Sequence, residues 1–291
     1  MVIDGRKEDV SEYRQVPRIK ELCAKHHTDG LMILTTPGGA DFVMDFFNPD
    51  GTGGMMCGNG GRCITAFADY LGLKPASPDG TWHFIAPDGP HEAKIIDGSE
   101  GTLPCEPSLR DPSHLRWAPP SYAAEGGHRF SGESTLRTWT VRLKMIDVQG
   151  VMPMKNGYFL NTGTRHYVEF RDDVDGIDME KEAKPLRWDP AFQPEGTNVN
   201  FVERTAEGLK VRTYEKGVEG ETLACGTGIT ASAIAAYWHK IPDQVRNDNK
   251  ALYRLQCHRG DWLSVEFKKE GPERFTHVYL TGPAELVEIL P

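Results

Sequence analysis

Hydrophobic and polar positions repeat with two different periods along the chain, which indicates a mixed α and β protein. In residues 16–26 apolar side chains recur with helical spacing, and Val16, Ile19, Leu22 and Cys23 share one face. Runs rich in β-branched and aromatic residues predict strands. In the first half of the chain these runs are 31–35, 42–47, 82–85, 91–96 and 138–146. In the second half they are 157–161, 167–170, 199–203, 209–214, 253–257, 262–267 and 276–281.

Two further segments predict the central helices of the fold. Residues 59–71 have a broad apolar face and end at Gly72, and residues 226–239 end before Pro242. The second helix is small or apolar on all sides, which indicates that a curved sheet wraps around it. Strands, a Gly-rich turn and a helix recur in both halves, as in an internal duplication. We therefore expect an α/β (α+β) fold of two pseudo-symmetric domains. Each is a curved, mostly antiparallel sheet around a central helix, with the active site in the cleft between them.

The expected domains are residues 1–152, joined by the C-terminal strand 281–291, and residues 153–280. Residues 98–135 differ from the rest of the first domain because they are rich in proline and show little periodicity. This composition predicts a long surface insertion between two strands, tolerated as a loop.

Composition excludes several classes of partner. The 291 residues are 38% hydrophobic and 26% charged, which is typical of a globular protein. The net charge of -9, with no basic stripe, argues against a nucleic-acid partner. Because no apolar run is long enough to cross a bilayer and no signal-peptide pattern opens the chain, we expect a cytoplasmic protein without a membrane partner. The 6 cysteines include no CxxC pair and predict neither a disulfide framework nor a metal site.

The most informative motif occurs twice. Cys57 and Cys225 each precede a Gly-polar-Gly turn that leads into a predicted helix. A cysteine at a helix start lies at the positive end of the helix dipole, which favours thiolate over thiol. The backbone N–H groups of the same helix starts are suited to hold a carboxylate. Two such units predict a matched acid and base that move a proton on and off one carbon atom, with water excluded.

Structural explanations compete with some of these assignments. A cysteine before a Gly-rich turn is often a small buried hydrophobe, and Cys23 and Cys63 lie on apolar helix faces where packing explains them. Asn48 also fits the first position of an Asn-Pro-Asp-Gly turn, and Asn198 follows a turn-like Gly-Thr pair. Glu215 also fits an ordinary surface carboxylate. The Gly-rich turns match neither nucleotide-binding pattern, GxGxxG or GxxxxGK[ST].

Several ordered segments resemble those of the diaminopimelate epimerase family. Residues 47–51 followed by 56–63 resemble its first active-site motif, and 214–217 followed by 221–228 resemble its second. Residues 161–166 and 196–201 are similar to two further family segments, and 281–284 to the closing strand. The resemblance covers most of the chain except 98–135 and roughly 240–250. It implies an epimerase that needs neither pyridoxal phosphate nor another cofactor and that interconverts LL- and meso-diaminopimelate in lysine biosynthesis. The family also implies a homodimer.

The resemblance implies roles for individual residues. Cys57 and Cys225 would be the two acid/base residues, supported by His166 and Glu215. The remaining residues would bind substrate. Its distal end or amino group would contact Asn48 and Asn198, and its α-carboxylate would be held by Gly58, Asn59, Gly226 and Thr227. Further substrate contacts would come from Thr164, Glu215 and Lys216.

The chain departs from the family pattern in three places. Relative to the family, it starts just after the first strand and a Gly-Asn-Asp-Phe segment, which predicts an unpaired neighbouring strand and one missing substrate contact. Thr164 stands where many members have Asn, and Lys216 replaces the usual Arg, whose forked geometry lysine lacks. Two alternatives stay open. One is another amino-acid racemase on the same fold, and the other is a protein that is not an enzyme, either a truncated, inactive homologue or a redox-responsive binding protein.

Overall fold

The computed structural model describes residues 1–7, 9–36, 38–54, 57–99, 114–117, 137–242 and 250–290. They form two compact units, Met1–Leu143 with Pro283–Pro291, and Lys144–Gly282. The sequence suggests a border after residue 152, whereas the structure has the first border after Leu143. The reason is pairing: β8 (Val148–Gln149) joins β17, and β9 (Met152–Pro153) joins β10, both within the second unit.

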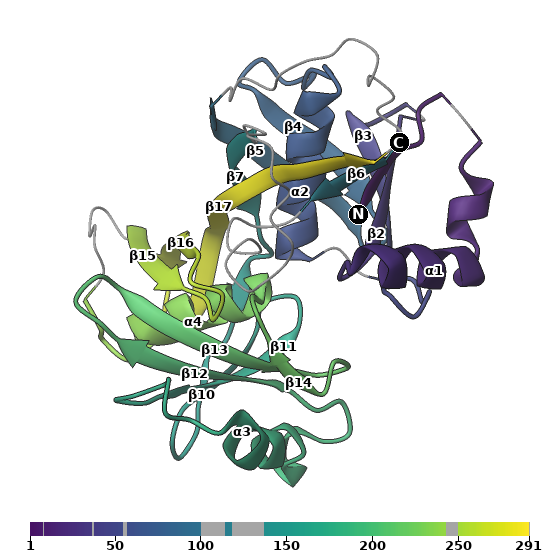
Figure 1. The fold of residues 1–291 in the computed structure, drawn as a ribbon. Coiled ribbons are helices and arrows are strands. Elements are labelled where there is room, and N and C mark those ends of the chain that lie inside the picture. The colour runs from purple at the N-terminus through teal and green to yellow at the C-terminus, as the bar shows by residue number, and fades with distance from the viewer. Residues whose placement is uncertain are drawn as a thin grey trace. The chain divides into compact units, whose positions relative to one another are not determined.

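The first unit is a mixed sheet with a helix packed on it (Figure 1). β1 runs parallel to β2, β2 antiparallel to β3, β3 parallel to β4, and β4 and β7 antiparallel to β5. Its elements are β1 (Val2–Asp4), η1 (Ser11–Arg14), α1 (Val16–His26), β2 (Leu31–Thr35), β3 (Phe42–Phe47), α2 (Gly58–Tyr70), β4 (Thr81–Ala86), β5 (Gly89–Ser99), β6 (His114–Trp117) and β7 (Thr138–Lys144).

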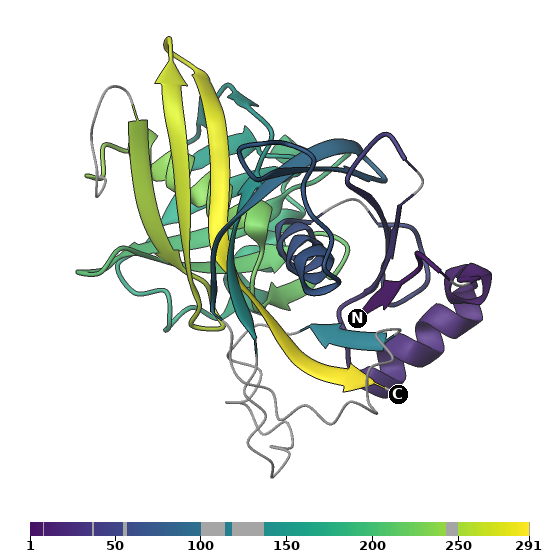
Figure 2. The ribbon, with the colours of Figure 1, turned by 90° about the horizontal axis from the view of Figure 1, so that it is seen from above.

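α2 is the central helix of this unit. Its Ile64, Ala66 and Phe67 side chains are fully buried, and the helix packs against β2 and β5. Figure 2 looks nearly along α2 and shows strands of the first unit around it. Phe42 and Phe84 stack at 4.8 Å between ring centroids and add to the apolar layer. The prediction of a helix at 59–71 is confirmed, one residue earlier than expected.

Two expectations about this unit are wrong. The segment 98–135 is not all loop: β5 extends to Ser99, and β6 pairs antiparallel with β1 and with β17. The other positions of that segment lie outside the described residues. The neighbour of the supposed missing strand is also not unpaired, because β2 pairs with β1 on one side and β3 on the other.

The second unit is a mostly antiparallel sheet wrapped around α4. β11 and β12 are parallel, while β10–β11, β12–β13, β13–β14, β15–β16 and β16–β17 are antiparallel. Besides β8 and β9, its elements are β10 (Tyr158–Asn161), β11 (Arg165–Phe170), α3 (Met179–Arg187), η4 (Pro190–Phe192), β12 (Asn198–Arg204), β13 (Leu209–Glu215), β14 (Gly220–Thr222), α4 (Gly226–Trp238), β15 (Lys250–Gln256) and β16 (Trp262–Glu270). β17 (Arg274–Leu290) starts in this unit and ends in the first.

α4 is buried as its sequence predicts. From Gly226 to Ala236 every residue except Thr227 is buried, and the helix packs against β10 to β13, β15 and β16. Its interior hydroxyls bond within the helix, since Thr230 and Ser232 donate to carbonyl oxygens four residues earlier at 2.9 and 2.8 Å. The curved sheet around the second central helix is therefore confirmed. Among the described residues, no helix is long and apolar enough to cross a membrane.

Candidate active site

The two cysteines occupy the same position at the start of their helices. Cys57 is the N-cap of α2 with φ -110° and ψ 155°, and its Sγ accepts a hydrogen bond from the Gly60 N–H at 3.2 Å. Cys225 is the N-cap of α4 with φ -124° and ψ 109°, and its Sγ accepts from the Gly228 N–H at 3.4 Å. Each thiol thus stands in for the usual Ser or Asp cap and points to the first turn of the helix.

The glycine three residues after each cysteine lies close to its neighbours, and at Gly228 the packing leaves no room for a side chain. A Cβ on Gly228 would lie 2.5 Å from Asn200 Nδ2, closer than any side chain tolerates. A Cβ on Gly60 would lie 3.2 Å from Cys57 Sγ and 3.3 Å from Met32 Sδ. The Gly-polar-Gly turns therefore bring the thiol and its neighbours close to the helix backbone.

In the first unit, Arg62 organises the turn after Cys57. Its guanidinium is buried and donates to Gly58 O at 3.0 Å, to Asn59 Oδ1 at 2.9 Å and to Pro283 O at 3.3 Å. A fixed positive charge beside the helix N-terminus favours an anion at this position. The sequence analysis missed Arg62; its one signal is a lone cation among the small residues of the helix start.

Asn48 lies in the first unit, and the contacts of its side chain support the turn interpretation. Its Nδ2 donates to Thr52 Oγ1 at 3.0 Å, and Gly51 N–H donates to Asn48 O at 2.9 Å. Gly51 has φ +83°, which a side chain would strain. Asn48 is thus part of the turn after β3, and its role in substrate binding stays a prediction.

In the second unit, a buried polar cluster surrounds the N-terminus of α4. Strand register creates it, because His166 on β11 lies beside Asn198 on β12, and Asn200 on β12 pairs with Thr213 on β13. The side-chain bonds form a chain. Asn200 Nδ2 donates to Thr213 Oγ1 at 2.7 Å, and Asn200 Oδ1 lies 2.7 Å from His166 Nδ1. Three of the residues expected near the reacting centre, His166, Asn198 and Cys225, thus belong to one unit.

His166 is neutral in this environment. Burial lowers its pKa to about 4, although the hydrogen bond to Asn200 opposes the shift. Since Asn200 presents its oxygen to Nδ1, that nitrogen carries the proton, and Nε2 accepts. Nε2 lies 2.9 Å from Thr164 Oγ1 and 3.0 Å from Thr227 Oγ1.

Asn198 links the segments that carry Thr164 and Lys216. Its Nδ2 donates to Thr164 Oγ1 at 3.2 Å and to Arg165 O at 3.0 Å, and its Oδ1 accepts from the Lys216 N–H at 2.8 Å. The turn-like interpretation of Asn198 is therefore wrong, because its side chain cross-links separate strands. At Lys216 the contact to Asn198 uses the backbone, which lysine supplies as well as arginine.

Glu215 ends β13 next to the second cysteine. Its Oε1 accepts from Thr222 Oγ1 at 2.5 Å, and its charge acts on the Cys225 thiol. Burial raises the pKa of Cys225 above its ordinary value, and the charge of Glu215 raises it further. The Thr227 hydroxyl and the Gly228 N–H lower the pKa but do not offset these effects. The expectation that the helix start favours a thiolate is thus wrong for Cys225 in the free protein, because desolvation of the charge outweighs the helix end.

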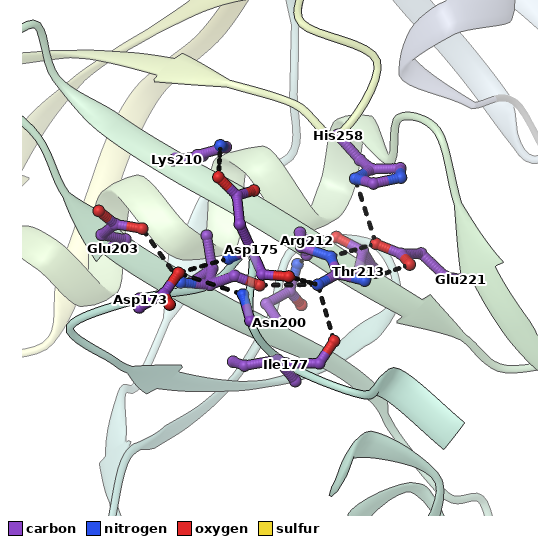
Figure 3. A network of polar contacts seen from close by, with 12 residues as sticks. Asp173, Asp175, Ile177, Asn200, Glu203, Lys210, Arg212, Thr213, Glu221 and His258 are labelled. Atoms are coloured by element: carbon purple, nitrogen blue, oxygen red, sulfur yellow. Dashed lines mark hydrogen bonds and ion pairs between the residues drawn. The ribbon is translucent and has the colours of Figure 1, made fainter. Parts of the chain in front are cut away.

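A second polar network, centred on Arg212, fixes β13, the strand that ends in Glu215 (Figure 3). Arg212 donates to both carboxylate oxygens of Glu221 at 2.6 Å and to the carbonyl oxygens of Val174 and Ile177 at 2.7 and 2.8 Å. His258 Nδ1 lies 3.4 Å from Glu221 Oε1. These contacts hold β14 on β13, and β14 carries Thr222, the hydrogen-bond donor to Glu215. The sequence analysis did not find Arg212, because its partners come from distant segments.

A cavity of about 700 Å³ lies at the other end of α4. Its lining includes Tyr158, Phe170 and His239. None of the residues predicted for the site lines it, so this cavity is separate from the predicted site.

The fold is shared with known proteins. A phenazine biosynthesis protein of the PhzF family from Bacillus anthracis superposes with a TM-score of 0.63 at 11% identity, covering 100% of this chain and 92% of that chain. A second PhzF family protein, from Enterococcus faecalis, gives a TM-score of 0.56 at 14% identity, covering 99% and 89%. At these identities the likeness shows the fold alone, an α+β architecture dominated by a mostly antiparallel sheet.

The sequence places the chain more narrowly. Residues 158–287 match the profile of diaminopimelate epimerase. Diaminopimelate epimerase of Flavobacterium psychrophilum is 33% identical over 291 residues, 99% of this chain and 93% of that protein. The enzyme of Chlorobaculum tepidum is 32% identical over 274 residues, 93% and 88% of the two chains. The chain is an isomerase of the epimerase class. It belongs to the diaminopimelate epimerase family.

Proposed function

We propose that this protein interconverts LL- and meso-diaminopimelate by moving the α-proton between two cysteines, without a cofactor. Membership of the family supports the reaction. The observation that carries the two-cysteine mechanism is the pair of N-cap cysteines with matched backbone geometry, Cys57 and Cys225. In this proposal the two thiols act on opposite faces of one substrate carbon.

The helix starts would bind the α-carboxylate. The backbone N–H groups at Gly58 and Asn59, and at Gly226 and Thr227, belong to first turns whose amides have no helical acceptor. They stabilise the charge that moves onto the carboxylate when the α-carbon loses its proton, because that charge lies near the positive helix ends.

One cysteine acts as a thiolate and the other as a thiol. The thiolate takes the α-proton, so that an S–H bond forms while the C–H electron pair stays on the substrate as an enediolate. The thiol on the opposite face then gives its proton to the carbon, which inverts the configuration. For Cys225 the raised pKa supports the thiol as the resting form, and in this proposal Glu215 supports it in the proton transfer.

The other assignments complete the proposal. Asn198, Thr164 and Lys216 contact the substrate beside His166, and Asn48 contacts its distal end. The place in lysine biosynthesis, a homodimer and a cytoplasmic location are part of the same proposal and rest on the family resemblance.

The test is solvent exchange. The protein is incubated with LL-diaminopimelate in D₂O, and deuterium at the α-carbon and formation of the meso isomer are followed by NMR and chiral chromatography. We expect both to occur, and Cys57→Ala or Cys225→Ala to abolish epimerisation. Cys63→Ala, a cysteine on the same helix as Cys57, is the matched control and should epimerise normally. Absence of exchange in the unaltered protein refutes the epimerase. Full epimerisation in either cysteine variant refutes the two-base mechanism.

A further inference from the structure

Two threonine hydroxyls compete for one nitrogen beside Cys225. Thr164 Oγ1 and Thr227 Oγ1 lie 2.9 and 3.0 Å from His166 Nε2, and 3.0 Å from each other. Because Nδ1 of the neutral ring carries the proton, Nε2 has a single lone pair and accepts from only one hydroxyl at a time. Thr227 Oγ1 is also 3.4 Å from Cys225 Sγ.

Two of the arrangements that these contacts allow differ in which hydroxyl donates to His166. Asn198 Nδ2 donates to Thr164 Oγ1, so the Thr164 proton is available for His166 or for Thr227. In the first arrangement the Cys225 thiol donates to Thr227, Thr227 donates to His166, and Thr164 donates to Thr227. In the second arrangement Thr227 donates its hydrogen bond to a Cys225 thiolate, and Thr164 donates to His166 Nε2 in its place.

The two arrangements correspond to the two states of Cys225. The first fits a thiol, which has a proton to give, and the second fits a thiolate, which needs a donor. In both, His166 Nε2 keeps one donor, and an unsatisfied nitrogen at this fully buried ring would cost free energy. The Thr164 hydroxyl can make this exchange because its oxygen accepts from Asn198 Nδ2 while its proton turns to His166 Nε2 at 2.9 Å, whereas Asn198 Nδ2 itself lies 3.5 Å from Nε2.

We propose that Thr164 is a positioning residue: it takes over the bond to His166 when Thr227 turns to the Cys225 thiolate, so that Cys225 serves as proton acceptor and as proton donor. The proposal rests on the proposed function and deepens it. When the thiolate takes the α-proton, the C–H bond breaks, the electron pair stays on the substrate, an S–H bond forms, and both hydroxyls rotate back. The hydroxyls keep their protons throughout.

Two titratable groups act on Cys225 within the second unit. Glu215 on β13 disfavours the thiolate through its charge and through a hydrogen bond with the thiol, while His166 on β11 is neutral and contacts Thr227. The Gly228 N–H of α4 donates to Sγ in either state. A change at Thr164 leaves all three in place, so its effect on the thiolate isolates the hydroxyl.

The test measures the thiolate directly in a Cys57→Ala background. Iodoacetamide alkylation of Cys225 is followed by mass spectrometry of its peptide between neutral and alkaline pH, and thiolate ultraviolet absorbance is recorded as a measure independent of access. Without the Thr164 hydroxyl, His166 Nε2 is left without this donor only when Thr227 turns to the thiolate, because in the thiol state Thr227 still donates to it. An unsatisfied buried acceptor corresponds to about a fivefold change, so Thr164→Val should lower the thiolate signal about fivefold at each pH. Thr164→Ser should restore it. The ultraviolet signal of Cys225 is the difference from a protein that also carries Cys225→Ala.

The controls separate this proposal from a structural effect and from the proposed function. Thr227→Val, which removes the direct donor, should lower the signal at least as much as Thr164→Val, and Thr227→Ser should restore it. A Thr164→Val protein with an unchanged unfolding midpoint and a thiolate signal within twofold of its parent overturns the proposal, as does failure of Thr164→Ser to recover. The measurement needs no diaminopimelate, so absence of α-proton exchange in the unaltered protein would refute the function and leave this result standing.

Discussion

The Arg212 network provides a sharp test of how the second unit holds Glu215. Replacing Arg212 by Met keeps most of the apolar stem but removes a guanidinium whose side chain is only 10% exposed. The carbonyl oxygens of Val174 and Ile177 then lose their donor, at about 1 kcal/mol each. Glu221, with a side chain 20% exposed, loses a bidentate partner at about 1 kcal/mol, less than for a fully buried pair because water reaches it.

We therefore expect Arg212→Met to lower the free energy of unfolding by about 3 kcal/mol, measured by urea denaturation at neutral pH. The matched control is Lys210→Met on the same strand, whose ion pair with Asp175 is largely exposed. An exposed pair contributes about 0 to 1 kcal/mol, so this variant should unfold nearly as the parent does.

The same change should also lower epimerisation in the folded protein. β14 carries Thr222, whose hydroxyl donates to Glu215, and Arg212 fixes β14 through Glu221. Equal stability losses for the Arg212 and Lys210 variants would refute the structural argument. Full activity of Arg212→Met, with its destabilisation intact, would refute the link to Glu215.

Three further outcomes follow from the site. Glu215→Gln removes a charge that disfavours the Cys225 thiolate, so Cys225 alkylation should become about tenfold faster while epimerisation falls; slower alkylation would contradict the charge effect. Gly228→Ala should displace Asn200 and abolish activity in a kinetic assay. Gly220→Ala should leave activity unchanged, because a Cβ added there meets no atom within 4 Å outside its chain neighbours. His166 has a folded pKa of about 4, below its unfolded value of about 6.5, so the unfolded chain binds the extra proton. Stability should drop by about 3 kcal/mol as pH falls from 6.5 to 4, and urea titrations of His166→Gln should lack this component.

Strong periodicity and explicit stop signals explain which elements the sequence predicts. The helix at 16–26 is observed at Val16–His26, and 226–239 at Gly226–Trp238, because both have clear apolar patterns. α3 is missed because most of its residues are charged, only Met179, Ala183 and Arg187 are buried, and Pro185 lies inside the helix. Its N-cap Asp178, which accepts from the Lys181 N–H, was the available signal.

The site residues also divide into those that a local sequence pattern predicts and those that it does not. Cys57 and Cys225 are found from sequence because their motif is local, a cap followed by glycines. Asn200 and Thr213 are not found, since the register of β11 on β12 brings Asn200 to His166 and the register of β12 on β13 brings Thr213 to Asn200. Local sequence therefore predicts the helix starts, while long-range strand pairing decides which side chains surround them.

The two cysteines share a motif but differ in environment, and this difference predicts their order of reaction. Cys57 is exposed, while Cys225 is 8% exposed and carries a raised pKa from burial and from Glu215. Only the thiolate reacts with an alkylating reagent, so a buried thiol with a raised pKa reacts slowly. In the ligand-free protein at mildly alkaline pH, Cys57 should be modified at least about tenfold faster than Cys225, as followed by peptide mass spectrometry. Equal rates would mean that Cys225 is ionised in the ligand-free protein. Burial and the charge of Glu215 would then not determine the ionisation of its thiol.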